Sequence, residues 1–363
     1  MNDPIQWWNL NLRGDHLKSL SGAFLEKKLS YGAIGQKLER RLESVLLTKH
    51  CLLTTSGSTS LLVALKALGV GPGDEVIVPN RTFVATANAV LMAGATVRLA
   101  DVSLDRALLD PASVESLITK KTKVILPVHL NGRACDMTRI LEIARNHGIF
   151  VVEDAAQAFM SSLRDKFLGT IGDIGCFSLG VTKFMTSGQG GFLITGSDAL
   201  IKNAKKYIFH SAQGEDVRHF NELGFNFRMS DLLSSIALFD LEQIESKKNK
   251  YIQNYLNYKE GLRGFKSVRL LECDILKGEV PIWIEVLSRQ RESFCNHLKE
   301  HRIESVKSYP SLHRSEYLSS SNSKFPNSEL FETDELILPC GPDVSESQIL
   351  QVLEVISSFE KRL

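Results

Sequence analysis

The sequence feature that most limits the possible folds is the apolar run GIFVVEDA at residues 148–155. Its length and its β-branched residues are typical of a strand buried on both faces of a parallel sheet. The run ends in Glu153 and Asp154, and active-site groups of open α/β sheets gather at the carboxyl ends of such strands. A Gly-rich segment then leads to Lys183, on a loop rich in Ser and Gly. We therefore expect Asp154 and Lys183 to share one pocket.

Strand, loop and helix signals alternate along the chain from Cys51 to Thr195. The segment VIVPNRTFVATANAVLMAGATVRLADVS contains one such unit, and VILPV followed by TRILEIARNHG contains another. This alternation predicts the crossover units of a parallel sheet that is flanked by helices. From Ser230 to about Leu262 the pattern indicates one long helix, which leads into short alternating strands and a final helix.

The length of the chain predicts two domains. Of its 363 residues 43% are hydrophobic, which is enough for one large core and a smaller one. We predict an α/β protein with a large, mainly parallel domain at 29–262, connecting helix included, and a small α+β domain at 263–363. Residues 1–28 form an N-terminal extension. Its Trp7 and Trp8 pack either on their own domain or, as an arm, on a second subunit.

Composition excludes several classes of partner. The 43 Lys and Arg balance 42 Asp and Glu, so net charge attracts neither nucleic acid nor a membrane surface. Without a signal-peptide pattern or a membrane-length apolar run, a cytoplasmic protein is the simplest interpretation. The six scattered cysteines form no CxxC pair and indicate reduced, mostly buried thiols. His297 and His301 have helical i, i+4 spacing, but their charged surroundings indicate a solvated face, and we expect no metal.

A lysine that shares a pocket with a buried carboxylate suits pyridoxal phosphate. The lysine amine forms a Schiff base with the aldehyde of this cofactor. A carboxylate beside the ring nitrogen raises the pKa of that nitrogen, so the protonated ring can withdraw electrons from a substrate carbanion. Lys183 and Asp154 can supply these two groups. The alternative is that Asp154 caps a helix and Lys183 is a solvated loop residue.

A second signal is the segment CLLTTSGSTSLLVALKALG, which predicts a short strand, a turn of small hydroxyl residues and a helix from about Ser60 to Leu68. The free N–H groups and the positive dipole end of a helix N-terminus suit a phosphate. Ordinary N-capping by Ser58 or Thr59 is the alternative. Phe83 precedes the next predicted helix, where it either stacks on a cofactor ring or packs in the core.

The segments EDAAQA, GD-x-G-CFSL, TK and SGQGGF, in this order, resemble the DegT/StrS family of sugar aminotransferases, fold-type I enzymes that use pyridoxal phosphate. The resemblance extends from about Leu29 to the C-terminus. It implies the following contacts to the cofactor: Lys183 as the Schiff-base lysine, Asp154 as the pyridinium partner, Gln157 against the ring face or ring hydroxyl, Phe83 stacked on the ring, and Gly57, Ser58, Thr59 and Ser178 at the phosphate.

The resemblance also implies a homodimer with shared active sites. GFNFRMSD matches the family's G-x-N-Y-R-M segment, whose Asn reaches the phosphate of the neighbouring subunit's cofactor, and this residue is Asn226 here. His313 and Tyr317 match an L-H-x-x-x-Y pattern that lies near the sugar or its phosphate. His129, which follows the strand VILPV, is a proton relay, a substrate contact or a hydrogen-bonded structural histidine.

Some relatives replace the lysine by His and act as dehydratases, whereas this chain keeps Lys183. The resemblance therefore implies transfer of an amino group from glutamate to a keto sugar. The expected acceptor is a nucleotide-linked 4-keto or 3-keto 6-deoxyhexose, for amino sugars of polysaccharides such as O-antigen. The alternatives are an acidic eight- or nine-carbon keto sugar, or a sugar dehydratase or epimerase of the same fold.

The chain departs from the family pattern at two places near the predicted site. Phe159 and Met160 stand where relatives usually carry His-Gly, and Gln189 stands where they often have Glu. We expect the first change to alter the size and polarity of the substrate pocket. The second removes a charge from the loop that follows Lys183.

Overall fold

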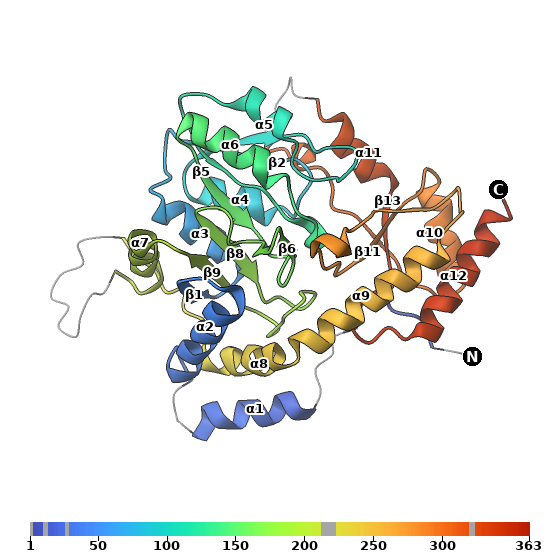
Figure 1. Ribbon diagram of the computed structural model, residues 1–363, viewed down its shortest axis with the longest axis horizontal. Coiled ribbons are helices and arrows are strands. Elements are labelled where there is room, and N and C mark those ends of the chain that lie inside the picture. Colours follow the sequence, from blue (N-terminus) through green and yellow to red (C-terminus); the bar gives the residue numbers. More distant parts are fainter. Residues whose placement is uncertain (1–2, 10–13, 26–28, 212–222, 319–323) are drawn as a thin grey trace.

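The computed structural model describes residues 3–9, 14–25, 29–211, 223–318 and 324–363. The centre of the large domain is a seven-stranded sheet with the strand order β1-β9-β8-β5-β4-β2-β3 (Figure 1). Its strands are β1 (His50–Thr54), β2 (Glu75–Pro79), β3 (Thr96–Ala100), β4 (Thr122–Ile125), β5 (Phe150–Asp154), β8 (Ile174–Ser178) and β9 (Gly191–Thr195). The Ser-rich tract at 319–323, predicted as a solvated loop, lies outside the described residues.

The predicted α/β fold with a mainly parallel sheet is confirmed, with one reversed strand. β5 pairs in parallel with β4 and β8, and β2 pairs in parallel with β3 and β4. β9 is antiparallel to both of its neighbours, β1 and β8. The segment between β8 and β9 forms no helix, so it cannot provide the crossover that a parallel connection requires. This loop carries Lys183.

Both faces of the sheet are covered, which explains the continuous apolar runs. The helices of the large domain are α1 (Gly14–Leu25), α2 (Ala33–Leu46), α3 (Gly57–Ala67), α4 (Ala85–Met92), α5 (Pro111–Leu117), α6 (Met137–His147), α7 (Asp198–Ile208) and α8 (Asp231–Glu242). On β1, Leu52 joins the core formed with α3, α4, α6 and α7, whereas Cys51 and Leu53 join the core formed with α2, α8, α9 (Ile244–Gly261) and the small domain. None of the helices in the described ranges has both the length and the apolar character needed to cross a bilayer.

The single long helix predicted from Ser230 to Leu262 is in fact two helices. α8 ends at Glu242 and α9 (Ile244–Gly261) begins after Gln243, whose backbone leaves helical geometry (φ −97°, ψ 4°). α8 packs on α1 and α2, and α9 packs on α12 of the small domain (Figure 1). The chain changes direction at Gln243 because its two halves pack against different domains, which a periodicity pattern does not reveal.

The small domain consists of a four-stranded antiparallel sheet in the order β10-β11-β13-β12, with helices packed on it. Its last helix begins with a capping box between Ser345 and Gln348 and buries Ile349, Val352 and Ile356. The elements are β10 (Arg269–Leu270), β11 (Ile284–Leu287), β12 (Val306–Lys307), β13 (Glu335–Leu338), α10 (Arg291–Glu300), α11 (Pro326–Asp334) and α12 (Glu346–Glu360). The large domain also has a short hairpin, β6 (Ser162–Leu163) and β7 (Lys166–Phe167).

Residues 3–9 of the N-terminal extension pack on the small domain of their own chain. The backbone N–H of Ile5 donates to the carbonyl of Arg302 (3.0 Å), and the N–H of Cys340 donates to the carbonyl of Trp7 (2.9 Å). The ring of Trp8 stacks on Tyr251 of α9 with the centroids 6.2 Å apart. Of the two alternatives for Trp7 and Trp8, packing on the same chain is the observed one.

A buried ionic cluster joins the two domains. Arg81 and Arg133, from loops of the large domain, pair with Glu285 on β11 and Glu335 on β13, and all four side chains are at most 3% exposed. Burial raises the pKa of Glu285, but Arg133 and Arg81 outweigh this effect and lower it to about 2. Removing one partner from such a cluster costs about 3–5 kcal/mol, because a charge is left buried and unpaired. The small domain is therefore held firmly over the large one.

The prediction that His297 lies on a solvated face is wrong, because His297 is only 3% exposed. Its Nε2 lies 2.8 Å from Oγ of Ser358, and Nη1 of Arg362 lies 3.0 Å from its Nδ1. Together with Glu300 and His301 it places possible metal ligand atoms within 4.8 Å of one another. Both nitrogens of His297 already have protein partners, however, and the neighbouring guanidinium disfavours a cation.

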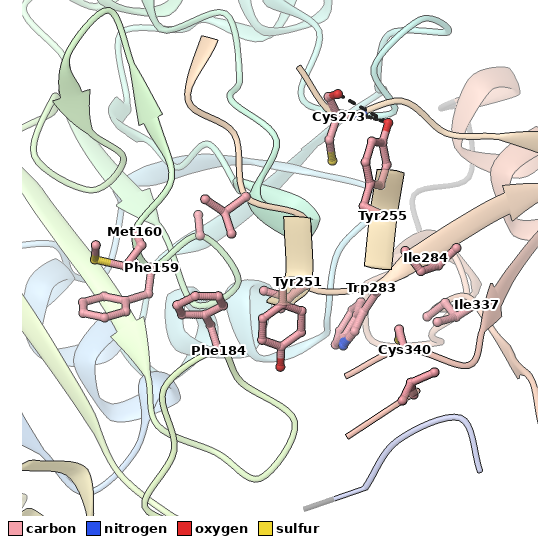
Figure 2. Packing of buried hydrophobic residues seen from close by; sticks show 14 of the residues in the cluster. Phe159, Met160, Phe184, Tyr251, Tyr255, Cys273, Trp283, Ile284, Ile337 and Cys340 are labelled. Atoms are coloured by element: carbon pink, nitrogen blue, oxygen red, sulfur yellow. Dashed lines mark hydrogen bonds between the residues drawn. The ribbon is translucent and has the colours of Figure 1, made fainter. Parts of the chain in front are cut away.

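The effect expected of Phe159 and Met160 on the substrate pocket is also wrong, because both side chains are core residues. Figure 2 shows Phe159, Phe184 and Tyr251 in a row that leads toward Trp283 and the small domain. The ring of Phe159 packs edge-on against Phe177, with centroids 6.1 Å apart, and is 6% exposed. This departure from the family pattern changes the packing behind the sheet rather than the wall of a pocket.

Candidate active site

The predicted site residues meet at the carboxyl edge of the parallel strands. Asp154 is the last residue of β5, and Ser178 is the last residue of β8. Phe83 follows β2, and His129 follows β4. The loop from β8 to β9 brings Lys183 to the same edge. Parallel strands end at a common edge, so residues distant in sequence are brought together there.

The carboxylate of Asp154 is 5% exposed and is oriented by two hydrogen bonds. Its Oδ2 accepts from the hydroxyl of Thr86 (2.8 Å), and its Oδ1 accepts from the backbone N–H of Ala156 (3.1 Å). Burial raises the pKa of Asp154, while these hydrogen bonds and the charge of Lys183 act in the opposite direction. Each oxygen keeps a second lone pair, which leaves the group able to accept a further proton donor.

Lys183 is close enough to Asp154 for their charges to influence each other. Burial lowers the pKa of the lysine amine to about 8, and the charge of Asp154 opposes this decrease. Nζ lies 5.7 Å from the ring centroid of Trp283. The pKa of this amine is therefore closer to physiological pH than that of an ordinary lysine. The alternative of a freely solvated lysine does not agree with this geometry.

The turn before α3 forms a candidate phosphate site together with the end of β8. α3 begins at Gly57, three residues earlier than predicted, and its N-cap is Ser56, whose Oγ accepts from the N–H of Thr59 (3.1 Å). The predicted alternative that Ser58 or Thr59 caps this helix is therefore wrong. The N–H groups of Gly57 and Ser58 have no acceptor within the helix. A Cβ at Gly57 would lie 2.7 Å from Cβ of Ser178, so glycine brings the turn against β8.

Gln157 is hydrogen-bonded to Asn131 and to Tyr309. Its Oε1 accepts from the backbone N–H of Asn131 (2.9 Å), and its Nε2 donates to the hydroxyl of Tyr309 (3.3 Å). The ring of Tyr309 lies 5.5 Å from Phe83 and 6.2 Å from Trp283, measured between centroids. Phe83, half exposed, thus faces the site through this row of rings. Tyr309 and Trp283 come from the small domain, so spacing near the predicted motifs could not find them.

His129 is fully buried and engaged at both ring nitrogens. Nδ1 accepts from the backbone N–H of Cys135 (3.2 Å), so Nε2 carries the proton and donates to Glu153 (2.9 Å). Glu153 in turn accepts from the N–H groups of Gly169, Ile171 and Gly172 at 2.7–2.9 Å. Of the three alternatives for His129, this geometry favours the hydrogen-bonded structural one.

A cleft of about 380 Å³ lies beside the phosphate turn, and Ser58, Thr59, Phe83 and Asn88 contribute to its lining. The hydroxyl of Tyr317 donates to Oδ1 of Asn88 (3.0 Å), which places this exposed side chain at the rim of the cleft.

His313 is more constrained than Tyr317. Its backbone N–H donates to Oδ1 of Asn80 (2.9 Å), and its Nε2 lies 3.2 Å from Glu329. Both residues therefore lie on the small-domain side of the site, with Tyr317 the more accessible to a ligand.

Asn226 is exposed and lies on a segment that is tied to the start of α3. The carbonyl of Phe227 accepts from the N–H of Thr55 (2.9 Å), just before the phosphate turn. Nε of Arg228 donates to Oδ1 of Asn226 (2.9 Å). This bond orients the Asn226 amide and leaves its NH₂ group available to a partner.

Comparison with known proteins assigns the chain to a family. The model of the DegT/DnrJ/EryC1/StrS aminotransferase family matches residues 12–357. The chain belongs to this family. It is 32% identical to GDP-perosamine synthase of Escherichia coli O157:H7 over 91% of both chains. It is 31% identical to dTDP-3-amino-3,4,6-trideoxy-alpha-D-glucose transaminase of Streptomyces venezuelae over 87% of this chain and 84% of that one.

Among solved structures, this chain resembles S. venezuelae DesV in complex with a ketimine intermediate, with a TM-score of 0.95, 27% identity and full coverage of both chains. The protein is therefore a pyridoxal phosphate-dependent aminotransferase of fold type I. The cofactor fits the residues at the site. The buried carboxylate of Asp154 has free lone pairs and matches the ring nitrogen of the cofactor. The amine of Lys183 matches its aldehyde. The N-terminus of α3, which lies close to Ser178 because residue 57 is glycine, matches its phosphate.

The contact at Gly57 makes a testable prediction for this aminotransferase. Gly57→Ala places a methyl group against Ser178, and relieving that overlap by moving the turn weakens the affinity for pyridoxal phosphate by about tenfold or more. Titration of the apo protein, followed by visible absorbance, measures this affinity. Gly196→Ala is the matched control, because a Cβ there meets nothing within 4 Å. Equal affinities of the two variants would contradict the assignment of the turn.

Proposed function

We propose that this aminotransferase transfers an amino group from glutamate to a nucleotide-linked keto sugar, specifically a 4-keto or 3-keto 6-deoxyhexose. The observation that carries the proposal is the placement of Lys183 beside Asp154 at the sheet edge, in a chain whose relatives act on sugars. The names of the two relatives above both contain a nucleoside diphosphate-linked amino sugar. Amino-sugar synthesis for surface polysaccharides such as O-antigen is the corresponding role.

When bound, pyridoxal phosphate supplies the aldehyde that exchanges the amino group and a ring that accepts the electrons of the broken C–H bond. The residues of the chain bind the cofactor and transfer protons. Gly57, Ser58 and Ser178 bind the phosphate through N–H and hydroxyl groups. Asp154 holds a proton at the ring nitrogen. Lys183 accepts the substrate α-proton and returns it, since burial brings the pKa of its amine to about 8, near the working pH.

Three further residues orient and shield the reacting groups. The amide of Gln157 is fixed by Asn131 and Tyr309, so it presents one defined edge to the cofactor ring. Phe83 covers a ring face and excludes water. Tyr317, at the rim of the cleft, is the residue placed to contact the sugar or its phosphate, and His313 orients the segment before it.

The experiment that tests the proposal is a panel of nucleotide-linked 3-keto and 4-keto sugars with glutamate as donor, scored for release of 2-oxoglutarate. We expect release with at least one 6-deoxy sugar of the panel and none with Lys183→Ala. The mass of the sugar product separates amine transfer from loss of water. A dehydrated or epimerised product would favour the dehydratase or epimerase alternative. Turnover confined to acidic eight- or nine-carbon keto sugars would replace the proposed acceptor.

We further propose a homodimer in which Asn226 binds the phosphate in the partner's site. Two features support this: the amide of Asn226 is exposed, and its orientation is fixed by Arg228. A two-fold dimer would bring this segment of one subunit to the phosphate turn of the other.

Mixing two defective variants tests this arrangement. Lys183→Ala and Asn226→Ala subunits are unfolded together and refolded to exchange partners. If the site uses Lys183 of one chain and Asn226 of the other, each heterodimer holds one intact site, so about a quarter of all sites recover. Refolding each variant alone is the control. If both residues act within one chain, mixing restores no activity.

A further inference from the structure

We propose that Trp283 of the small domain is a positioning residue for the amine of Lys183, and that Asn131 holds Trp283 in place. This inference rests on the proposed role of Lys183 as the reactive lysine. It assigns the small domain a direct part in setting the charge and position of that amine.

The contact between Lys183 and Trp283 crosses the domain boundary. Nζ lies 5.7 Å from the centroid of the indole ring, within the range of a cation–π interaction. Trp283 is 4% exposed and directly precedes β11. Its Nε1 is buried and has no hydrogen-bond partner within the described part of the chain. The indole is therefore not anchored through its own N–H, and its position depends on how the backbone at 282–283 is held.

Asn131 holds that backbone through every hydrogen-bonding group of its side chain. Oδ1 accepts from the N–H groups of Ile282 (3.0 Å) and Trp283 (2.6 Å). Nδ2 donates to the carbonyl of Trp283 (2.8 Å) and to Oε2 of Glu285 (3.1 Å). Asn131 is 1% exposed and adopts the left-handed conformation (φ 51°), which Asn tolerates better than most residues. This complete set of bonds fixes residues 282–283 of the small domain on the large one.

The same residue also acts on the other flank of the site. Its backbone N–H donates to Oε1 of Gln157 (2.9 Å) and so decides which end of that amide faces the cofactor. Gln157 then donates to Tyr309, whose ring lies 6.2 Å from Trp283. Asn131 is thus bonded both to Trp283, whose ring lies near Lys183, and to Gln157, which is bonded to Tyr309.

Of the acidic groups near Lys183, Asp154 acts on the amine directly, whereas Glu285 and Asp240 are paired with other residues. Asp154 on β5 faces the amine and raises its pKa, against the effect of burial. Behind Asn131, Glu285 is bound to Arg133. On α8, Asp240 accepts from the N–H of Thr186 (2.9 Å) and pairs with Lys247. The amine also lies 5.7 Å from the centroid of the Trp283 ring, and a cation–π interaction at this distance favours its protonated form.

The test measures the reactivity of Lys183 in the apo protein. The rate of acetylation by acetic anhydride as a function of pH, followed at Lys183 by peptide mass spectrometry, gives the pKa of this amine. Trp283→Leu keeps an apolar side chain without a π face, and we expect it to lower this pKa by about half a unit to one unit. Trp283→Phe keeps a ring and produces a smaller decrease. An unchanged or raised pKa in Trp283→Leu would overturn the proposal.

A second variant tests the part played by Asn131. Asn131→Ala removes the hydrogen bonds to residues 282–283 without adding a charge, so it shifts the pKa of Lys183 in the same direction as Trp283→Leu. The double variant shows no further shift if Asn131 acts through Trp283, whereas additive shifts would reject this link. Asn257→Ala on α9, where the amide oxygen accepts from Gln253 (2.9 Å), is the matched control.

The outcomes also separate this inference from the proposed function. Borohydride reduction of the loaded parent protein, followed by peptide mapping, shows which lysine carries the cofactor. A label at another lysine would refute the proposed function itself. A label at Lys183, combined with an unchanged pKa in Trp283→Leu, would refute only the role of Trp283. The Trp283 variants test the role of Trp283 even if Asn131→Ala fails to fold.

Discussion

Replacing Lys183 by alanine is expected to lower the rate of transamination by at least about 10³-fold, because the variant loses both the covalent attachment of the cofactor and the group that moves the α-proton. The fold should be unaffected, since the substitution removes an amine whose burial is already unfavourable and leaves the paired groups of the ionic cluster untouched. The measurement is single-turnover conversion of glutamate to 2-oxoglutarate. Thermal denaturation verifies that the variant is folded.

Lys183→Arg is the matched control for charge. It keeps a cation near Asp154, but a guanidinium stays protonated and forms no Schiff base, so it should be as inactive as Lys183→Ala. The purified parent protein should be yellow after loading, and neither variant should bind the cofactor covalently. A variant at position 183 that turns over within tenfold of the parent would show that another group performs the proton transfer.

The second large effect is expected for Asp154→Asn, which should lower the rate by about 10²- to 10³-fold. The amide is isosteric and still accepts a hydrogen bond from Thr86, but it carries no charge to keep the ring nitrogen protonated. The charge of Asp154 also raises the pKa of Lys183, so its removal should lower that pKa below about 8. In the apo variant the amine then becomes neutral at a lower pH, and its acetylation profile shifts in the acid direction.

Asp198→Asn on α7 is the control for a carboxylate far from this pocket. That carboxylate is exposed and pairs with Lys49 and His50. Its loss should therefore change neither the rate of transamination nor the pH profile of acetylation at Lys183. If Asp154→Asn kept the parent rate while the acetylation profile shifted as expected, Asp154 would act on the lysine but not on the cofactor ring.

Local signals predicted most of the large domain. The run ending in Asp154 is β5 as expected, and the small hydroxyl residues near Gly57 do lie at the N-terminus of a helix, although this helix begins earlier than predicted. Such features depend on neighbours in sequence, on periodicity and on the demands of turns, so they can be recognised without a structure. The cap at Ser56 was missed because several adjacent hydroxyl residues can each cap a helix, and only the path of the chain selects one.

Other features depended on contacts that no local pattern encodes. The reversal of β9 follows from the absence of a helix in the loop that carries Lys183. The break at Gln243 follows from the packing of α8 and α9 on different domains. Phe159 was expected to line the pocket, yet it packs edge-on against Phe177 in the core. In each case the neighbours in space are far away in sequence.

The sequence alone predicted that Asp154 and Lys183 share one pocket, because Asp154 ends a recognisable buried strand and Lys183 lies on the loop that the Gly-rich pattern predicts. Only the tertiary structure decided what surrounds that pair. Trp283 and Tyr309 reach the site from loops of the small domain, where Trp283 is bonded to Asn131 and Tyr309 to Gln157. The physical reason is that strand formation follows from local hydrophobic pattern, whereas the environment of a side chain is set by long-range packing.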